Sequence, residues 1–196
     1  MITREPVLRT ERLSLFRPER VDLAAVLAVH GDPETNRHNP DGPMRSSEQG
    51  ERWLRRWIED WSRDGVGYFT VVRTSEPTQV IGFAGLKVAT VGIARGDRPV
   101  DDAHEGPADH VRALNLYYRF RPSSWGQGLA AEAARAALDH TRPHHPELPA
   151  YALIRADNLA SLRLAARLGF QATGEVDAAG RRVHLLGVPG QLTDPS

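Results

Sequence analysis

Apolar residues recur at two different spacings along the chain, and these spacings predict strands and helices. In LRTERLSLFR (residues 8–17) apolar and polar residues alternate loosely, as in a strand. In GERWLRRWIEDWSRDG (50–65) apolar residues return every three or four positions, as on one face of a helix. The patterns predict strands at 8–17, 68–72, 80–88, 111–120, 150–156, 171–176 and 181–188, and helices at 23–31, 46–65, 129–140 and 158–169.

Turn and cap residues mark the ends of several of these elements. Asp22 is placed to cap the first helix, and Ser46 with Gln49 has the spacing of a capping box at the start of the second. The segment Ser-Glu-Pro-Thr (75–78) joins two strands as a hairpin turn. Gly169 is a natural C-terminal residue for the last helix.

The order of the elements predicts the fold class. A strand, two helices and several antiparallel strands are followed by a β-loop-α-β-α-β-β arrangement. This order predicts an α/β (α+β) fold in which a mixed, mostly antiparallel twisted sheet is flanked by helices. We expect one domain over residues 1–196, with a long surface insertion at 90–112, a segment rich in Gly, Pro and Asp.

Composition narrows the classes of function. The 25 basic residues balance the 25 acidic ones, so we expect no nucleic-acid partner. The charged start of the chain is unlike a signal peptide and no apolar run reaches the length of a membrane helix, so we expect a cytoplasmic protein without a membrane partner. The chain contains no cysteine, which excludes disulfides, thiolate metal sites and a cysteine nucleophile.

A glycine loop at a helix start is the strongest candidate for a binding site. In PSSWGQGLAAEAARAALDH (122–140), Gly126 and Gly128 precede an alanine-rich helix. Such glycines let successive backbone N–H groups turn inward, and the helix dipole adds about half a positive charge, so the loop suits a phosphate.

Two nucleotide motifs are alternatives for this loop. Gly126-x-Gly128-x-x-Ala131 fits the relaxed dinucleotide fingerprint, but only 68 residues follow Gly128, too few for two mononucleotide-binding halves. A P-loop is excluded because no Lys-Ser/Thr pair follows the glycines.

A third interpretation comes from a family resemblance. Residues 118–133 (YRFRPSSWGQGLAAEA) resemble the coenzyme A loop of the GNAT N-acetyltransferase superfamily, whose signature is Q/R-x-x-G-x-G/A. Gly128 and Ala130 match it, and Trp125 stands at the Q/R position, as is usual in the ribosomal-protein N-acetyltransferase-like branch. The resemblance extends to LRTERLSLFRP (8–18), HGDPETNRH (30–38), VIGFAGL (80–86) and NLASLRLAARLGF (158–170), whereas 90–112 has no clear counterpart.

This resemblance implies a GNAT fold with a splayed coenzyme A-binding strand pair, and an N-acetyltransferase. The enzyme would move an acetyl group from acetyl-CoA directly to a primary amine in a ternary complex, without a metal, as a monomer or homodimer. The acceptor would be a protein N-terminal α-amine or a small-molecule amine. The cofactor-binding residues that it implies are Tyr118, Arg119, Phe120, Trp125, Gly126, Gln127, Gly128, Leu129, Ala130, Asn158 and Ser161.

Asn158 and Ser161 are also the candidate catalytic residues. Asn158 is a plain helix cap, a contact to the pantetheine arm of the cofactor, or both. Ser161 is either a surface serine or the general acid that protonates the leaving thiolate. Much of the superfamily uses a tyrosine as this acid, and its position here holds Ala165.

The general base stays open. The slot that holds a glutamate in many relatives holds Asn115, which cannot take a proton. Other candidates are His110, Asp109, Glu132 and His184. The missing tyrosine and glutamate also allow an alternative function, a catalytically retired module that binds acyl-CoA as a sensor or scaffold.

Three further features have two interpretations each. Trp53, Trp57 and Trp61 form either a packing stripe or a wall of the acceptor cleft. His140 and His144 have helical spacing, but Pro143 interrupts the helix and argues against a metal site. The 90–112 insertion is a solvated loop or an acidic guide for a cationic acceptor, through Asp97, Asp101, Asp102, Glu105 and Asp109.

Overall fold

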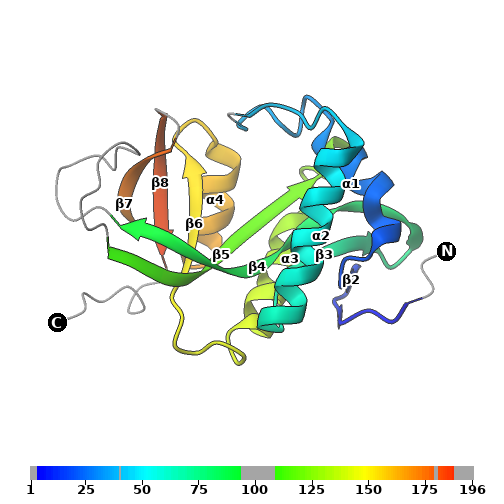
Figure 1. Ribbon diagram of the computed structural model, residues 1–196, viewed down its shortest axis with the longest axis horizontal. Helices are drawn as coiled ribbons and strands as arrows, with labels where there is room; N and C mark the ends of the chain where they lie inside the picture. Colours follow the sequence, from blue (N-terminus) through cyan, green and yellow to red (C-terminus); the bar gives the residue numbers. More distant parts are fainter. Residues whose placement is uncertain (1–3, 40, 94–108, 179–180, 188–196) are drawn as a thin grey trace. The chain divides into compact units, whose positions relative to one another are not determined.

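The structure is a computed structural model in which the chain forms two compact units (Figure 1). The first unit comprises Met1–Lys87 and Tyr117–His144, and the second comprises Val88–Leu116 and His145–Ser196. The backbone is described for residues 4–39, 41–93, 109–178 and 181–187, and side chains are described for 4–39, 41–90 and 112–172.

The first unit contains the strands β1–β3, most of β4 and the end of β5. Its strands follow one another in the order β1-β2-β3-β4-β5, and β1 to β4 pair antiparallel. Two short 3₁₀ helices, η1 and η2, precede α1 and the glycine loop. The elements are β1 (Leu8–Arg9), β2 (Leu13–Phe16), η1 (Arg20–Asp22), α1 (Leu23–His30), α2 (Ser47–Asp64), β3 (Tyr68–Arg73), β4 (Glu76–Ile93), β5 (Asp109–Phe120), η2 (Pro122–Ser124) and α3 (Leu129–Thr141).

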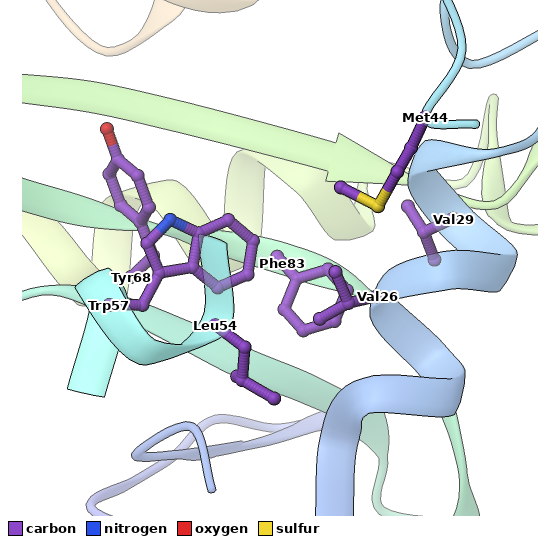
Figure 2. Close-up of a cluster of buried hydrophobic side chains, with 7 residues drawn as sticks. All are labelled: Val26, Val29, Met44, Leu54, Trp57, Tyr68 and Phe83. Atoms are coloured by element: carbon purple, nitrogen blue, oxygen red, sulfur yellow. The ribbon is translucent and has the colours of Figure 1, made fainter. Parts of the chain in front are cut away.

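An apolar cluster fixes α1 and α2 on strands β3 and β4 (Figure 2). Its members come from all four elements and from the segment before α2, and they are Val26, Val29, Met44, Leu54, Trp57, Tyr68 and Phe83. The ring of Trp57 lies 5.2 Å from that of Phe83 and 5.7 Å from that of Tyr68. Burial of such large apolar surfaces is the main force that holds helices on a sheet.

The second unit contains the start of β5 and the strands β6 (Ala150–Arg155), β7 (Gln171–Ala178) and β8 (Arg181–Gly187), with helix α4 (Leu159–Arg167). Strand β8 pairs antiparallel with both β6 and β7. Strands β5 and β6 run parallel, and their register covers only Leu114 with Ala150 and Asn115 with Tyr151. This short parallel pairing is what a splayed strand pair requires, and the predicted fold class is confirmed.

Most of the predicted caps are confirmed. The Ser46 hydroxyl accepts a hydrogen bond from the Gln49 N–H, as predicted, and the Gln49 side chain accepts one from the Arg45 N–H. Gly65 ends α2 in the left-handed conformation, with φ at 71°.

Asp22 does not cap α1, which corrects the prediction. Its carboxylate is buried and accepts hydrogen bonds from the Arg4 guanidinium, the Glu19 N–H and the Thr70 hydroxyl. The side chain therefore ties the N-terminal segment to β3.

Three predicted boundaries are wrong for local reasons. The expected single strand at 8–17 is two strands, because the Thr10 hydroxyl bonds Leu13 and turns the chain between them. The hairpin turn is Thr74–Ser75 rather than 75–78, since Arg73 pairs directly with Glu76. The segment 90–112 is not a loop throughout, because β4 continues to Ile93 and β5 begins at Asp109. Residues 94–108 lie outside the described part of the chain.

Candidate functional site

The glycine loop connects η2 to α3 and has the backbone conformation that was predicted. Gly126 and Gly128 have φ values of 71° and 75°, in the left-handed region that favours glycine. A Cβ atom added at Gly126 would meet nothing within 4 Å, and one at Gly128 would meet only the Arg12 guanidinium at 3.6 Å. The positive φ values favour glycine at both positions. Packing does not, because an added Cβ atom would have room at each of them.

The backbone amides of this loop are left without an acceptor in the part of the chain that the structure describes. Among the residues that the structure describes, no backbone N–H from Gly126 to Ala131 donates a hydrogen bond, and the series resumes with Glu132 N–H to Gly128 O at 3.0 Å. Six consecutive N–H groups at the N-terminus of a 13-residue helix thus have no acceptor among the described residues. This is the arrangement that binds phosphate groups, since both the free donors and the helix dipole favour negative charge.

Side chains from the N-terminal hairpin hold the loop from outside. The Arg12 guanidinium donates to the carbonyl of Gln127 at 2.9 Å and to the Glu132 carboxylate at 2.7 Å. The Thr10 hydroxyl and the Arg12 N–H donate to the same carboxylate, at 2.5 and 3.0 Å. The Gln127 side chain accepts a hydrogen bond from Arg73 and donates one to Ser123 O. We call Thr10, Arg12 and Glu132 the loop clasp.

Glu132, a candidate general base, is engaged in this clasp. Burial acts to raise the pKa of its carboxyl, but the hydrogen bonds from Thr10 and Arg12 outweigh burial and lower that pKa. A carboxylate with both oxygens occupied by donors and with a low pKa is a poor proton acceptor. Its contacts indicate a role in supporting the loop.

The other predicted cofactor residues of the first unit lie on β5 and around the loop. Tyr118 and Arg119 are half-buried, and Phe120 is buried. Trp125 is 45% exposed, and its indole N–H donates to Phe120 O at 2.8 Å. Leu129 is buried and anchors the start of α3, with the half-buried Ala130 after it.

Asn158 and Ser161 belong to the second unit, at the start of α4. The Asn158 side chain accepts a hydrogen bond from the Ser161 N–H at 3.1 Å, so its predicted role as a helix cap is confirmed. The side chains of both residues are half-buried. Ala165, at the position where many relatives have a tyrosine, is fully buried and its carbonyl accepts the Phe170 N–H, so this side of α4 is committed to packing.

For most of the remaining candidates for the general base, the structure describes the backbone and not the side chain. Asn115 is half-buried in β5, opposite Tyr151. Asp109 and His110 begin β5, and His184 pairs in β8 with Ile154 and Glu175, but the side chains of these three residues lie outside the described part.

Sequence reasoning missed a contact between the buried His30 and the half-buried Tyr117. The Nε2 atom of His30 lies 2.7 Å from the Tyr117 hydroxyl, and its Nδ1 atom lies 3.0 Å from Val26 O. Burial, and then the nearby Arg119, lower the pKa of His30 to about 4. The only signal in the sequence was a histidine in the last turn of a helix, which is common where a cation meets the helix dipole.

The tryptophan stripe is mainly a packing feature. Trp57 and Trp61 are each 5% exposed, and the Trp61 indole N–H donates to Tyr68 O. Trp53 is half-buried, with its ring 5.3 Å from that of His30. The ring of His140 lies 4.8 Å from that of His144 and 6.3 Å from that of Trp61. The described side chains contain no group of three or more residues that could hold a metal ion.

Two observations concern other classes of site. A cavity of about 390 Å³ lies at the start of α1 and β4, between Arg4, Asp22, Thr78 and Arg121, and its lining includes none of the glycine loop. Within the described ranges, no helix is both long enough and apolar enough to cross a membrane.

Comparison with known proteins agrees with this geometry. Residues 12–171 match the model of the acetyltransferase (GNAT) domain. The uncharacterized N-acetyltransferase p20 of Bacillus licheniformis is 25% identical over 167 residues, which cover 85% of this chain and 83% of that protein.

Solved structures share the fold over nearly the whole chain. A chain assigned to the GNAT acetyltransferase family from Bordetella pertussis superposes with a TM-score of 0.70 and 26% identity, covering 92% of this chain and 98% of its own. RimL, a ribosomal L7/L12 α-N-protein acetyltransferase solved with coenzyme A, superposes with a TM-score of 0.66 and 16% identity, covering 93% and 97%. Because the domain model matches well over half of the residues and the glycine loop has the required free amides, the chain belongs to the GNAT acetyltransferase family.

Proposed function

We propose that the protein is an N-acetyltransferase that moves an acetyl group from acetyl-CoA to a primary amine. The family is that of acetyltransferases, and the observation that carries the cofactor assignment is the run of six unpaired amides from Gly126 to Ala131. The cofactor pyrophosphate would accept hydrogen bonds from these amides, with the exposed Trp125 beside the loop. Acetyl-CoA supplies the acetyl group as a thioester, whose sulfur departs as a thiolate.

The chain's own residues would orient the reactants and manage protons. Backbone groups of β5 at Tyr118–Phe120 would hold the pantetheine arm and polarise the acetyl carbonyl. The neutral amine nitrogen attacks the carbonyl carbon and the C–S bond breaks. The proton lost from nitrogen replaces the one that the thiolate takes from Ser161 or from water, so the products are the amide and the free thiol. Thiols have an ordinary pKa of about 8.5, so the thiolate is a fairly good leaving group and a weak acid suffices.

The proton on the amine favours a weakly basic acceptor. An α-amine with a pKa near 7.7–8.0 is roughly a tenth neutral at pH 7, whereas a lysine amine near 10.4 is about a thousandth neutral or less. With Asn115 in the glutamate slot and Glu132 held in the loop clasp, a strong base is missing from these two positions. We therefore propose an acceptor with an α-amine or a similarly weak base, in a ternary complex.

A thermal-shift experiment with matched glycine variants tests the cofactor site. Coenzyme A should raise the Tm of the wild-type protein, because a ligand that binds only the folded state stabilises it. Gly128→Val should abolish this shift by placing bulk where the phosphates bind. Gly65→Val is the control, since Gly65 has nearly the same φ and equally open surroundings but lies at the end of α2.

The outcomes of this experiment separate strain from ligand exclusion. Both variants should lose stability, but only Gly128→Val should lose the response to coenzyme A. A full response in Gly128→Val would contradict the loop assignment. Release of thiol with a panel of amines then distinguishes a transferase from an acyl-CoA sensor, which would bind coenzyme A and release no thiol.

A further inference from the structure

Two alternate residues of β5 present polar groups on one face of the strand. Tyr117 and Arg119 are two positions apart, so their side chains point to the same side. His30 at the end of α1 stacks near the ring of Tyr117, with centroids 6.3 Å apart and planes inclined by 11°. Asn36, in the segment between α1 and α2, contacts Arg119. All four residues belong to the first unit, which also carries the glycine loop.

The hydrogen bonds of His30 decide which way the Tyr117 hydroxyl points. Val26 O can only accept, so the Nδ1 atom of His30 carries the proton that it donates there. A histidine whose pKa is lowered to about 4 has a single ring proton at neutral pH, and its Nε2 atom is then an acceptor. The Tyr117 hydroxyl must therefore donate to Nε2. Burial raises the pKa of Tyr117 to about 12, which keeps this proton in place.

This arrangement makes the Tyr117 oxygen an acceptor for any further partner. A tyrosine hydroxyl has one proton and two lone pairs. With its proton committed to His30, the oxygen offers only lone pairs to a bound molecule. A primary amine, which always carries N–H donors, matches such an oxygen.

Arg119 provides a positive charge on the same face. One of its nitrogens, Nη1, donates to the Asn36 side-chain oxygen at 2.5 Å. The Asn36 amide nitrogen donates in turn to the carbonyls of His30 and Asp32, both at 2.8 Å, which fixes the position of its oxygen. Within the described part of the chain, no carboxylate pairs with Arg119 and no further hydrogen bond is formed by its other nitrogens.

A half-buried guanidinium with no counter-ion among the described residues is a recognition feature. Arginine presents its donors in a planar fork that matches a carboxylate in two parallel hydrogen bonds. Its guanidinium carbon lies 5.9 Å from the centre of the Tyr117 ring, so an amine at the hydroxyl and an anion at the guanidinium are within reach of one small molecule.

We propose that Tyr117 and Arg119 form the acceptor-recognition pair of this acetyltransferase, and that the acceptor is a primary amine with a carboxylate close to it, as in an α-amino acid. The Tyr117 oxygen accepts a hydrogen bond from the amine, and Arg119 binds the carboxylate. This inference rests on the proposed function. It excludes polyamines as preferred acceptors, since the guanidinium repels a second cationic group.

The first test needs no variant. Thiol release from acetyl-CoA is measured with α-amino acids, with the corresponding amino-acid amides and with spermidine. The amides keep the amine and lose the carboxylate charge. The α-amine of a free amino acid is more basic than that of its amide, so kcat/KM is compared per concentration of neutral amine. On that scale at least one amino acid should show a value ten or more times that of its own amide and of spermidine.

Substitutions then assign the preference to the two residues. Arg119→Gln should raise the acceptor KM at least tenfold and remove the difference between acid and amide. It should change the Kd of acetyl-CoA far less, because only the backbone of Arg119 is proposed to hold the pantetheine arm. Arg37→Gln is the control, because it removes an equal charge from an exposed position next to Asn36. Tyr117→Phe should raise the KM of the amino acid and of its amide by a similar factor of about five to ten, the usual value of one hydrogen bond. Retention of the coenzyme A thermal shift shows that each variant is folded.

Three results would overturn the proposal, and they differ from one another. Equal kcat/KM per neutral amine for amino acids and amides in the wild-type protein removes the recognition pair but leaves the transferase. A loss of acetyl-CoA affinity in Arg119→Gln equal to its loss of kcat/KM assigns the guanidinium to the cofactor instead. No thiol release with any amine removes the proposed function, and the pair with it.

Discussion

Asn158 has two expected tasks that two substitutions can separate. Its side-chain oxygen caps α4, and the expectation from the sequence is that its side chain also contacts the pantetheine arm. Asn158→Ala should lower the free energy of unfolding by about 1 kcal/mol through loss of the cap and reduce turnover about a hundredfold through misplacement of the arm. Asn158→Asp keeps an oxygen at the cap, so it should retain stability and still lose turnover. Full turnover in Asn158→Asp would leave Asn158 as a cap alone.

Because of His30, the protein should become less stable as the pH falls below about 6.5. Its pKa is lowered in the folded protein to about 4, from 6.5 when unfolded, by burial and by Arg119. The unfolded chain therefore binds a proton that the folded chain does not, and stability falls as the pH falls from about 6.5 to 4. At 1.36 kcal/mol per pH unit the loss approaches roughly 3 kcal/mol.

Urea unfolding at pH 7 and pH 4.5 checks this dependence. The wild-type protein should lose more stability between the two values than His30→Gln does. The pKa of His140 is also lowered, first by burial and then by His144 and Arg17, and both proteins share that contribution. An identical pH dependence in the two proteins would contradict the buried neutral state of His30.

The limits of prediction at the residue scale follow from the distance between partners in the sequence. Asn158 could be predicted as a cap because its partner, Ser161, is three residues away. His30 and Tyr117 are separated by 87 positions, and Arg119 and Asn36 by 83. Nothing in either local segment indicates such a contact, so both pairs appear only once α1 and β5 are in place.

At the scale of elements, a substitution in the loop clasp should change the affinity for coenzyme A through two opposing effects. Glu132→Gln removes a negative charge close to the proposed phosphate site, and electrostatics alone would strengthen coenzyme A binding. It also weakens the charge-assisted hydrogen bonds to Arg12 that hold the loop. We expect the second effect to win, with a Kd for coenzyme A several-fold higher by calorimetry.

Thr10→Val is the matched variant for this prediction, because it removes a hydroxyl from the same carboxylate without changing the charge. It should raise the Kd in the same direction. Tighter binding in Glu132→Gln would show that charge, not support of the loop, governs affinity.

The ends of helices could be predicted where the residues that mark an end lie next to it in the sequence. Ser46, Gly65 and the glycines before α3 mark ends that the structure confirms. The break between β1 and β2 coincides with four consecutive polar residues at 9–12 that interrupt the apolar pattern, and the hydrogen bonds of the Thr10 hydroxyl form the turn there.

At the scale of the whole molecule, the acidic segment between β4 and β5 stays a prediction, since 94–108 lie outside the described residues. Its charge should attract cationic acceptors at long range, whereas Arg119 would act on the bound acceptor. Asp101→Asn with Asp102→Asn should raise the KM of an acceptor that carries a net positive charge at low salt and matter less at high salt, where the charges are screened. The affinity for acetyl-CoA should be unchanged. An acceptor KM that ignores both substitutions at every salt concentration would exclude a guiding role.

The single domain expected from the sequence also stays a prediction. The chain divides into two compact units, and each unit combines segments that are distant in the sequence. Length and composition bound the size of a core but do not show where contacts become sparse, so this division had no signal in the residues themselves.

The loop clasp has a consequence for the synthesis of the protein. Arg12 and the Gln127 carbonyl that it binds are 115 positions apart. At roughly 5–20 residues per second, a ribosome adds residue 127 roughly 6 to 23 seconds after residue 12. The partner of Arg12 is therefore absent through most of translation, and a nascent chain should gain the proposed affinity for coenzyme A only after α3 has emerged.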